Sequence, residues 1–176
     1  MIELEKTYLA KYFPKGLRNC KSKEIIDIFI PKSSVHPTLR IRKNGNKCEI
    51  TKKEPVKGND SSHQREQTII LTEAEFRELA QLDGKQVSKI RYCYDYNGRT
   101  AEIDVFQGPL KGLVVVDFEF EEIREKDSFE MPDFCLADVT QEKFIAGGML
   151  CGKSYEDIED DLKRFNYSKL FLNPKL

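Results

Sequence analysis

The sequence lacks the features that mark disulfide-bonded, zinc-binding or membrane-spanning proteins. No two of its cysteines form a CxxC pair, so neither a disulfide framework nor a structural zinc site is expected from Cys20, Cys48, Cys93, Cys135 and Cys151. No run of about 18 apolar residues is present, so we expect no membrane-spanning helix. The first residues are acidic and lack an apolar stretch, so we expect no signal peptide. These absences predict a cytoplasmic protein with reduced thiols.

The chain also has little excess of either charge. Its 176 residues contain 29 Lys and Arg against 30 Asp and Glu, which gives a net charge of -1. No overall attraction to nucleic acid or to a membrane follows from that balance, so we expect neither as a partner. The length suits one domain over residues 1–176, and leaves the oligomeric state open between monomer and homodimer. Any electrostatic function must therefore come from where the charges are placed.

What the chain does contain is a repeated alternation of apolar and polar residues between turn signals. Asn44-Gly45 and Asn97-Gly98 each separate two alternating runs, as is typical of β-hairpins. The alternation predicts strands over residues 2–10, 25–31, 38–43, 47–54, 64–71, 87–96, 99–106 and 113–122. Strands joined by such short turns indicate an α+β protein with an antiparallel sheet or barrel.

Helical patterns interrupt the strands. Helices are predicted over residues 72–82, from Thr140 to the Gly147-Gly148 pair, and over about 155–165. Thr72 suits the N-cap of the first helix because its hydroxyl can accept a hydrogen bond from the first turn. The region 128–137 is expected to form loops or short helical turns.

The polar faces of the strands are almost entirely ionic. Residues two apart share one face of a strand, so same-sign charges lie together. Pairs of this kind are Glu3 with Glu5, Arg40 with Arg42, Lys89 with Arg91, Glu102 with Asp104, and Asp117 with Glu119. Like charges this close repel unless a counter-charge lies between them. Carboxylate pairs without His or Cys favour Mg²⁺ or Mn²⁺, whereas paired Arg and Lys favour phosphate.

Two interpretations of this pattern remain open. A sheet with one charged face in solvent would show the same alternation, and would suit a plain scaffold or partner-binding protein. In a closed barrel the apolar faces could point outward and the charged faces inward. An inward ionic set is costly without ligands, so this second arrangement predicts a site for a metal-bridged polyphosphate.

Short motifs recur in a fixed order along nearly the whole chain. They are Glu3-Leu4-Glu5, Leu39-Arg40-Ile41-Arg42, Ile50-Thr51-Lys52-Lys53, Arg65-Glu66, Lys89-Ile90-Arg91-Tyr92, Ala101-Glu102-Ile103-Asp104-Val105-Phe106, Gly112-Leu113, Asp117-Phe118-Glu119-Phe120 and Asp138-Val139-Thr140. In this order they resemble the CYTH family, also called triphosphate tunnel metalloenzymes. The resemblance implies a closed eight-stranded antiparallel β-barrel with surrounding helices, whose interior binds a triphosphate and metal ions. It also implies a metal-dependent triphosphatase, with inorganic tripolyphosphate as the favoured substrate.

The resemblance further implies roles for individual residues. Metal-binding carboxylates match Glu3, Glu5, Glu66, Asp104, Asp117 and Glu119. The phosphate-binding set matches Arg40, Arg42, Lys53, Lys89 and Arg91, with Lys153 as a further candidate that a solvated loop lysine would explain equally well. The expected catalytic residues are Glu3, Glu5, Lys53 and Arg91. The expected cofactor is Mg²⁺ or Mn²⁺.

One position departs from the family's pattern. The family's first motif, Glu-x-Glu-x-Lys, ends in a lysine thought to help activate the attacking water, and Thr7 stands at that position here. Lys6 would point to the other face unless a β-bulge redirects it, and Lys11 lies nearer the end of the strand. The substitution leaves open a non-catalytic module that binds polyphosphate or a nucleotide. Nucleotide or thiamine triphosphate hydrolysis and adenylate cyclisation also remain alternatives.

Overall fold

The computed structural model describes residues 2–172. Its strands are β1 (Ile2–Ala10), β2 (Lys21–Ile30), β3 (Leu39–Asn44), β4 (Lys47–Pro55), β5 (His63–Leu71), β6 (Lys85–Tyr96), β7 (Arg99–Phe106), β8 (Val114–Phe120) and β9 (Cys135–Asp138). The α-helices are α1 (Glu73–Leu79), α2 (Ile123–Ser128), α3 (Gly147–Leu150) and α4 (Glu159–Lys163). Short 3₁₀ turns are η1 (Leu17–Asn19), η2 (Gly108–Leu110), η3 (Lys143–Ile145) and η4 (Glu156–Ile158). Within residues 2–172, no helix has the length and apolar character needed to cross a membrane.

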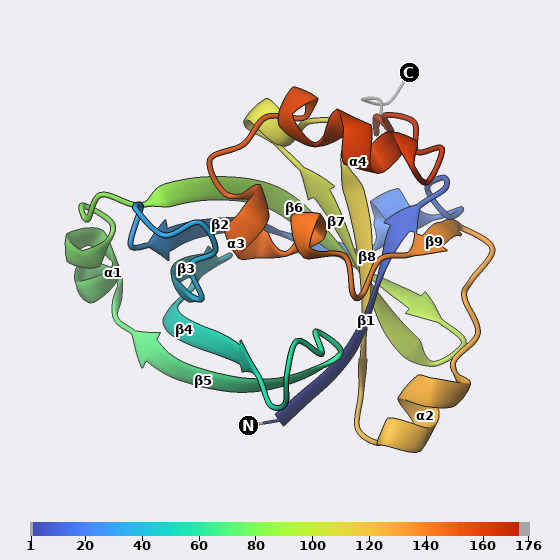
Figure 1. Cartoon of the computed structure of the whole chain (residues 1–176), viewed down its shortest axis with the longest axis horizontal. Coiled ribbons are helices and arrows are strands. Elements are labelled where there is room, and N and C mark those ends of the chain that lie inside the picture. Colours follow the sequence, from blue (N-terminus) through green and yellow to red (C-terminus); the bar gives the residue numbers. More distant parts are fainter. Residues whose placement is uncertain (1, 173–176) are drawn as a thin grey trace.

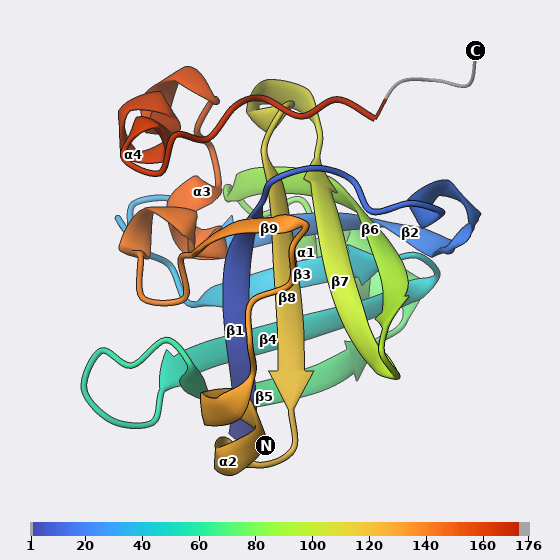
Figure 2. The ribbon, with the colours of Figure 1, turned by 90° about the vertical axis from the view of Figure 1, so that its right-hand side faces the viewer.

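Strands β1 to β8 close into an antiparallel barrel. Around it the order is β1, β5, β4, β3, β2, β6, β7, β8 and back to β1. The first residues of β1 pair with β5. Further along the same edge of β1, residues Tyr8–Ala10 pair with β9 (Figure 2). The expected eight-stranded closed barrel is therefore confirmed, while β9 falls in a region where only loops or helical turns were predicted.

The register of the strands decides which interior charges meet. Asp27 lies directly opposite Arg42 across β2 and β3, and Glu5 lies opposite Glu119 across β1 and β8. The β6–β7 hairpin fixes part of this register through Asn97 and Gly98, whose φ angles are 55° and 80°. Positive φ at both central residues is what a type I′ turn requires, and Asn-Gly provides it.

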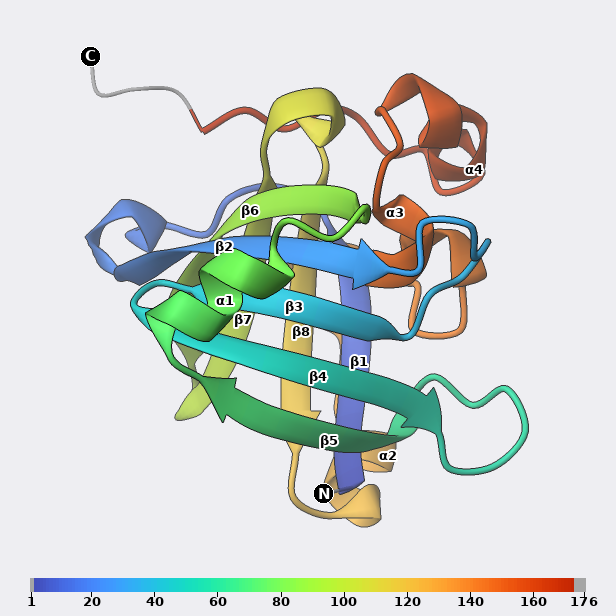
Figure 3. The ribbon, with the colours of Figure 1, turned by 90° about the vertical axis from the view of Figure 1, so that its left-hand side faces the viewer.

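Much of the hydrophobic core lies on the outside of the barrel wall. Phe118 on β8 is fully buried and packs against Phe129, Tyr8 and Tyr96, at ring-centroid distances of 4.6, 6.1 and 6.1 Å. This outer face is covered by α2, β9 and the segment that joins them, while α1 lies against β3 and β4 (Figures 2 and 3). Because Phe118 is anchored outward, its neighbours on β8 point into the barrel.

The inner face becomes apolar at one end of the barrel. This apolar layer consists of Leu9, Phe29, Val87, Phe106 and Val115 from the strands, with Ile145 of η3 and Leu150 of α3. The short helices η3 and α3 cover this end (Figure 1). The charged interior is therefore bounded on one side by a packed hydrophobic cap.

The helix predicted to start at Thr140 is wrong. The Thr140 backbone N–H and hydroxyl both donate to Asp138 Oδ1, at 3.0 and 2.6 Å, so the residue forms a local turn instead of a helix start. The glycine pair begins α3 and does not end a helix. A Cβ at Gly148 would lie 2.3 Å from the Pro37 carbonyl oxygen, so glycine permits this close approach to the β2–β3 loop. The third predicted helix is present but shorter, as η4 and α4.

Replacing Phe118 with alanine should destabilise the barrel strongly. The change leaves a cavity among three aromatic rings, and such truncations cost about 3–5 kcal/mol of unfolding free energy. Urea unfolding followed by far-UV circular dichroism measures the loss. The matched control is Phe171→Ala, because that side chain is 52% exposed. Equal stability losses in the two variants would show that Phe118 does not anchor β8.

Candidate active site

The barrel brings together most of the residues proposed from the sequence. From the inner face project Glu3, Glu5, Arg40, Arg42, Lys53, Glu66, Lys89, Arg91, Asp104, Asp117 and Glu119. Lys153 is placed elsewhere, between α3 and η4, and does not line the interior cavity formed by the described residues. The period-two argument thus grouped these charges on one face of each strand correctly, and the family resemblance implied that this face lies inside the barrel; neither gave the partners.

A central cluster forms around Asp104, which is fully buried on β7. Its carboxylate accepts hydrogen bonds from Lys89 Nζ and from Arg91 Nε and Nη2, the last two at 2.7 Å. Arg91 also pairs with Glu102, and lies 3.5 Å from Asp117 Oδ2. Burial alone would raise the pKa of Asp104, but Arg91 and Lys89 outweigh it and hold the pKa well below its ordinary value. Asp104 is therefore an ionised hub shared by two cations.

A second cluster forms where β1 faces β4. Lys53 Nζ lies between two carboxylates, 2.7 Å from Glu3 Oε2 and 2.8 Å from Glu5 Oε2. Burial raises the pKa of Glu5 to about 7; Lys53 opposes this shift, and the negative charges of Glu3 and Asp117 add to it. Burial lowers the Lys53 pKa, but the two glutamates outweigh it and leave that pKa above its ordinary value. The lysine ammonium therefore occupies the place of a cation between paired acids.

The two arginines of β3 have different environments. Arg42 Nε and Nη2 donate to the two carboxylate oxygens of Asp27, at 2.6 and 2.8 Å. Arg40 Nε is buried without a hydrogen-bond partner, and Arg40 Nη2 lies 3.8 Å from Glu66 Oε2. Burial and the neighbouring Arg42 charge lower the pKa of Arg40. The sequence motif Arg-Ile-Arg gives no sign of this difference.

Asp27 is the interior residue that sequence reasoning missed. It is 3% exposed and shares the inner face of β2 with Ile25 and Phe29. The sequence did contain a sign of a buried charge here, since Asp27 is the single acid in the apolar run Ile-Ile-Asp-Ile-Phe-Ile. The search for same-sign pairs two residues apart passed over it because Asp27 has no acidic neighbour on its own strand.

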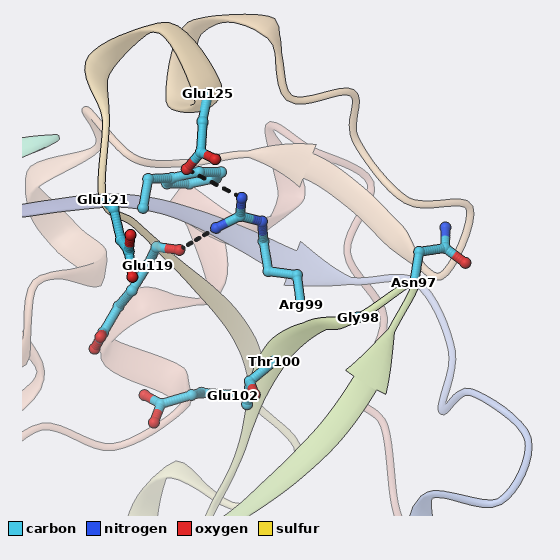
Figure 4. A pocket seen from close by; sticks show the side chains of 9 residues that line it. Asn97, Gly98, Arg99, Thr100, Glu102, Glu119, Glu121 and Glu125 are labelled. Carbon is cyan, nitrogen blue, oxygen red and sulfur yellow. Dashed lines mark hydrogen bonds and ion pairs between the residues drawn. The ribbon is translucent and has the colours of Figure 1, made fainter.

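The interior contains a partly open cavity of about 200 Å³. Its polar side is lined by Glu5, Thr7, Asp27, Lys53, Lys89, Asp104 and Asp117, and the apolar layer bounds its other side. A wider pocket of about 580 Å³ lies at the opposite end of the barrel, where Glu102 and Glu119 meet Glu121 and Glu125 (Figure 4). There Arg99 donates to the Glu119 carbonyl oxygen at 2.8 Å and contacts Glu125 at 3.2 Å.

Comparison with known proteins supports the resemblance of the motifs. An inorganic triphosphatase from Nitrosomonas europaea is 30% identical over 144 residues, which cover 81% of this chain and 92% of that protein. The chain belongs to the CYTH family. A crystal structure of an inorganic triphosphatase superposes with a TM-score of 0.62 at 24% identity, over 86% of this chain and 95% of that chain. Another, described as a hypothetical protein, gives 0.63 at 25% identity, over 86% and 99%. No family model matches the chain.

The CYTH motif lysine has no replacement on β1. The Thr7 hydroxyl faces the cavity and donates to Asp117 Oδ1 at 2.8 Å. Lys6 points outward and donates to the Phe129 carbonyl oxygen at 3.2 Å. The register shift of β1 comes only between Leu9 and Ala10, which is too late in the strand to turn Lys6 inward. Lys11 is exposed beyond the end of β1.

The carboxylates of this CYTH barrel suit a hard divalent cation. Among residues 2–172, no three acidic, His or Cys side chains converge into a ready-made coordination site. Even so, Glu5 and Glu119 are opposite in register, with Glu3 beside them, and all supply oxygen. Burial raises the pKa of Glu119, and Glu102 and Glu3 raise it further. A bound cation would relieve this repulsion, as the Lys53 ammonium partly does.

The stability of the metal-free protein should fall as pH rises from about 4.5 to 7. The pKa of Glu5 in the folded state is about 7 against an ordinary 4.5, so between these values the folded form holds a proton that the unfolded form has released. Thermal unfolding in EDTA across this range measures the slope. Glu5→Gln should flatten it, whereas Glu121→Gln, at an exposed position, should retain the wild-type slope. Parallel profiles for all three proteins would contradict the prediction.

Proposed function

We propose that this CYTH protein hydrolyses inorganic tripolyphosphate to pyrophosphate and phosphate inside its barrel. The proposal is supported by family membership and by the relative that is named an inorganic triphosphatase. It is carried by one observation in this chain, the buried Arg40 guanidinium whose Nε has no hydrogen-bond partner. Buried donors are almost always satisfied, so an unpaired one on the inner face of the barrel calls for an acceptor.

Phosphate oxygens are the acceptors that suit Arg40. Its side chain is 16% exposed, and burial disfavours its charge unless an anion lies nearby. A guanidinium presents its donors as a planar fork, which matches the spacing of phosphate oxygens. A phosphoryl group beside Arg40 would therefore satisfy both the free donor and the buried charge.

The other basic residues would hold the remaining phosphates. Lys89 and Arg91 share the carboxylate of Asp104, and Arg91 also contacts Glu102 and Asp117, so both cations are held in fixed orientations. Lys53 lies between Glu3 and Glu5, and faces the same cavity. Donors fixed in this way favour the transition state of phosphoryl transfer, because they are already oriented when charge shifts to the leaving oxygen.

Charge balance favours a metal cofactor, which we propose to be Mg²⁺ or Mn²⁺ held by Glu3, Glu5 and Glu119. The basic interior residues of the described chain are outnumbered by the acidic set Glu3, Glu5, Asp27, Glu66, Glu102, Asp104, Asp117 and Glu119. A triphosphate would add further negative charge to a buried space. When bound, the metal ion would supply the missing positive charge on the phosphate oxygens.

Because Thr7 stands in place of the motif lysine, we infer that a carboxylate of the chain accepts the proton of the attacking water. Thr7 already donates to Asp117, whose pKa is raised by burial and by the charge of Asp104. A carboxylate with a raised pKa is a better proton acceptor near neutral pH than an ordinary one. We therefore propose Asp117 as the acceptor; if the lost lysine instead abolished turnover, the protein would remain a polyphosphate-binding module.

We place the enzyme in the cytoplasm. All five cysteines are free thiols, three of them buried. Free thiols are typical of reducing compartments.

Wild-type protein should release phosphate from tripolyphosphate with Mg²⁺ or Mn²⁺, and EDTA should abolish the release. Arg40→Gln should lower kcat/KM by about 100-fold, because removing one donor from a preorganised anion site costs this order of rate. Phosphate release measured by a colorimetric assay tests both points. The matched control is Arg77→Gln, which removes an exposed ion pair with Glu73 and should leave activity unchanged.

Three outcomes would redirect the interpretation. A thermal shift with tripolyphosphate but without phosphate release would indicate the binding module. A preference for ATP or thiamine triphosphate would indicate a different substrate within the same family. Full activity of Arg40→Gln would show that Arg40 does not hold the substrate, and the proposal would lose its main support.

A further inference from the structure

The second half of β5 has a strand edge that no other strand covers. Among residues 2–172, β1 pairs with β5 only at His63–Arg65, and the other edge of β5 is taken by β4. The segment Gln67–Leu71 is therefore paired on one side only. It is the part of β5 that leads into α1 (Figure 3).

The backbone of this segment presents unpaired groups at the open edge. At the start of the strand, the Glu5 N–H donates to the Ser62 carbonyl oxygen at 3.2 Å, so the backbone groups of Ser62 point to the β1 side. Successive residues of a strand direct these groups to opposite edges. Along a regular strand, the even-numbered Thr68 and Ile70 therefore direct their N–H and C=O groups to the open edge.

The side chains of this segment do not protect the edge. Gln67–Leu71 contains no charged residue and no proline. Ile69 and Ile70 are 67% and 69% exposed, and Ile69 also lines an open groove of about 630 Å³ with Leu39 and Ile50. Exposed strand edges are usually blunted by Lys, Pro or a bulge, because they can otherwise pair with another chain. An uncharged, apolar edge of this kind suits a partner that adds a strand.

A second copy of the chain is a partner that fits this edge. Two β5 strands can pair antiparallel about Ile69, so that Ile69 of the two copies face each other and Thr68 of each copy faces Ile70 of the other. The outward N–H and C=O groups of Thr68 and Ile70 would then all be paired in both copies. This arrangement is isologous, as in most homodimers, because each copy contributes the same surface.

The charges at the two ends of the segment are complementary in the same register. Arg65 lies four residues before Ile69 on β5, and Glu73 lies four residues after it, at the start of α1. Antiparallel pairing about Ile69 brings Arg65 of each copy toward Glu73 of the other. Glu73 is exposed and already contacts Arg77, and its carboxylate can accept from a second arginine. Opposite charges across a strand pair favour the register that brings them together.

We propose that the chain forms a homodimer in which the open edges of two β5 strands pair antiparallel about Ile69. The interface joins the walls of two barrels into one continuous sheet. The inference does not depend on the proposed hydrolysis, because it concerns the edge of the wall and not the interior cavity.

Sedimentation velocity of the full chain over a concentration series tests the proposal. The wild-type protein should sediment as a dimer. Ile69→Lys should raise the dimer dissociation constant at least tenfold, because it places two lysines directly opposite each other. The matched control is Val35→Lys, which changes a side chain that is 79% exposed in the β2–β3 loop and should leave the dissociation constant unchanged.

Disulfide cross-linking tests the register without adding charge to the edge. In the proposed pairing the two Ile69 Cα atoms form a non-hydrogen-bonded pair about 4.5 Å apart, which is within the range that a disulfide can bridge. Ile69→Cys should therefore form a covalent dimer on mild oxidation. Ile70→Cys should do so much less, because Ile70 faces Thr68 of the other copy. The wild-type protein gives the background from its own free thiols.

A wild-type protein that stays monomeric throughout the series overturns the inference. A dimer whose dissociation constant is the same for Ile69→Lys and Val35→Lys overturns it as well, since the copies would then meet elsewhere. Where Ile69→Lys does not fold, cross-linking decides: equal yields for Ile69→Cys, Ile70→Cys and wild-type protein would contradict the proposed pairing.

Discussion

The pairing of opposite charges inside a closed barrel is the constraint on which the rest of this structure depends. Asp104 and Asp27 are buried on neighbouring parts of the wall, and each is tolerated because arginine fills its hydrogen-bonding capacity. Removing one partner of such a pair would leave a lone charge in a poorly solvated space, which is far more costly than losing an exposed salt bridge. Strand register is therefore as important for balancing the buried charges of the interior as it is for backbone hydrogen bonding.

Because the barrel interior is ionic, many of the apolar side chains pack into a hydrophobic core outside the barrel wall. On β8 the alternation sends Asp117 and Glu119 inward and Phe118 outward, so the outer surface must be covered. Helix α2, strand β9 and the segment between them provide that cover, and Phe129 stacks within 4.6 Å of the Phe118 ring centroid. These peripheral elements hold the strands that carry the interior carboxylates, and thus support the site from outside.

The sequence predicted what depends on local pattern and missed what depends on long-range contacts. Strict alternation and two Asn-Gly turns were enough for strands β1 to β8 and for the charges that share one face of each, because both follow from backbone periodicity. That this face points inward came from the family resemblance. Asp27 was missed because its partner, Arg42, lies on another strand, and register across a long loop is not visible in a local window. The helix expected at Thr140 failed for a similar reason, since Thr140 makes a turn with Asp138 and accepts from the Thr7 N–H.

The same ion pairs that stabilise the empty barrel set the terms on which it can bind an anion. A phosphate that approaches Arg91 would compete with Asp104, Glu102 and Asp117 for this cation, whereas Lys89 pairs with Asp104, a carboxylate that Arg91 can still hold. Separating Arg42 from Asp27 would instead break both hydrogen bonds of a buried bidentate pair. The basic residues of β3 and β6 therefore differ in their partners, although the sequence presents them as equivalent pairs of cations two residues apart.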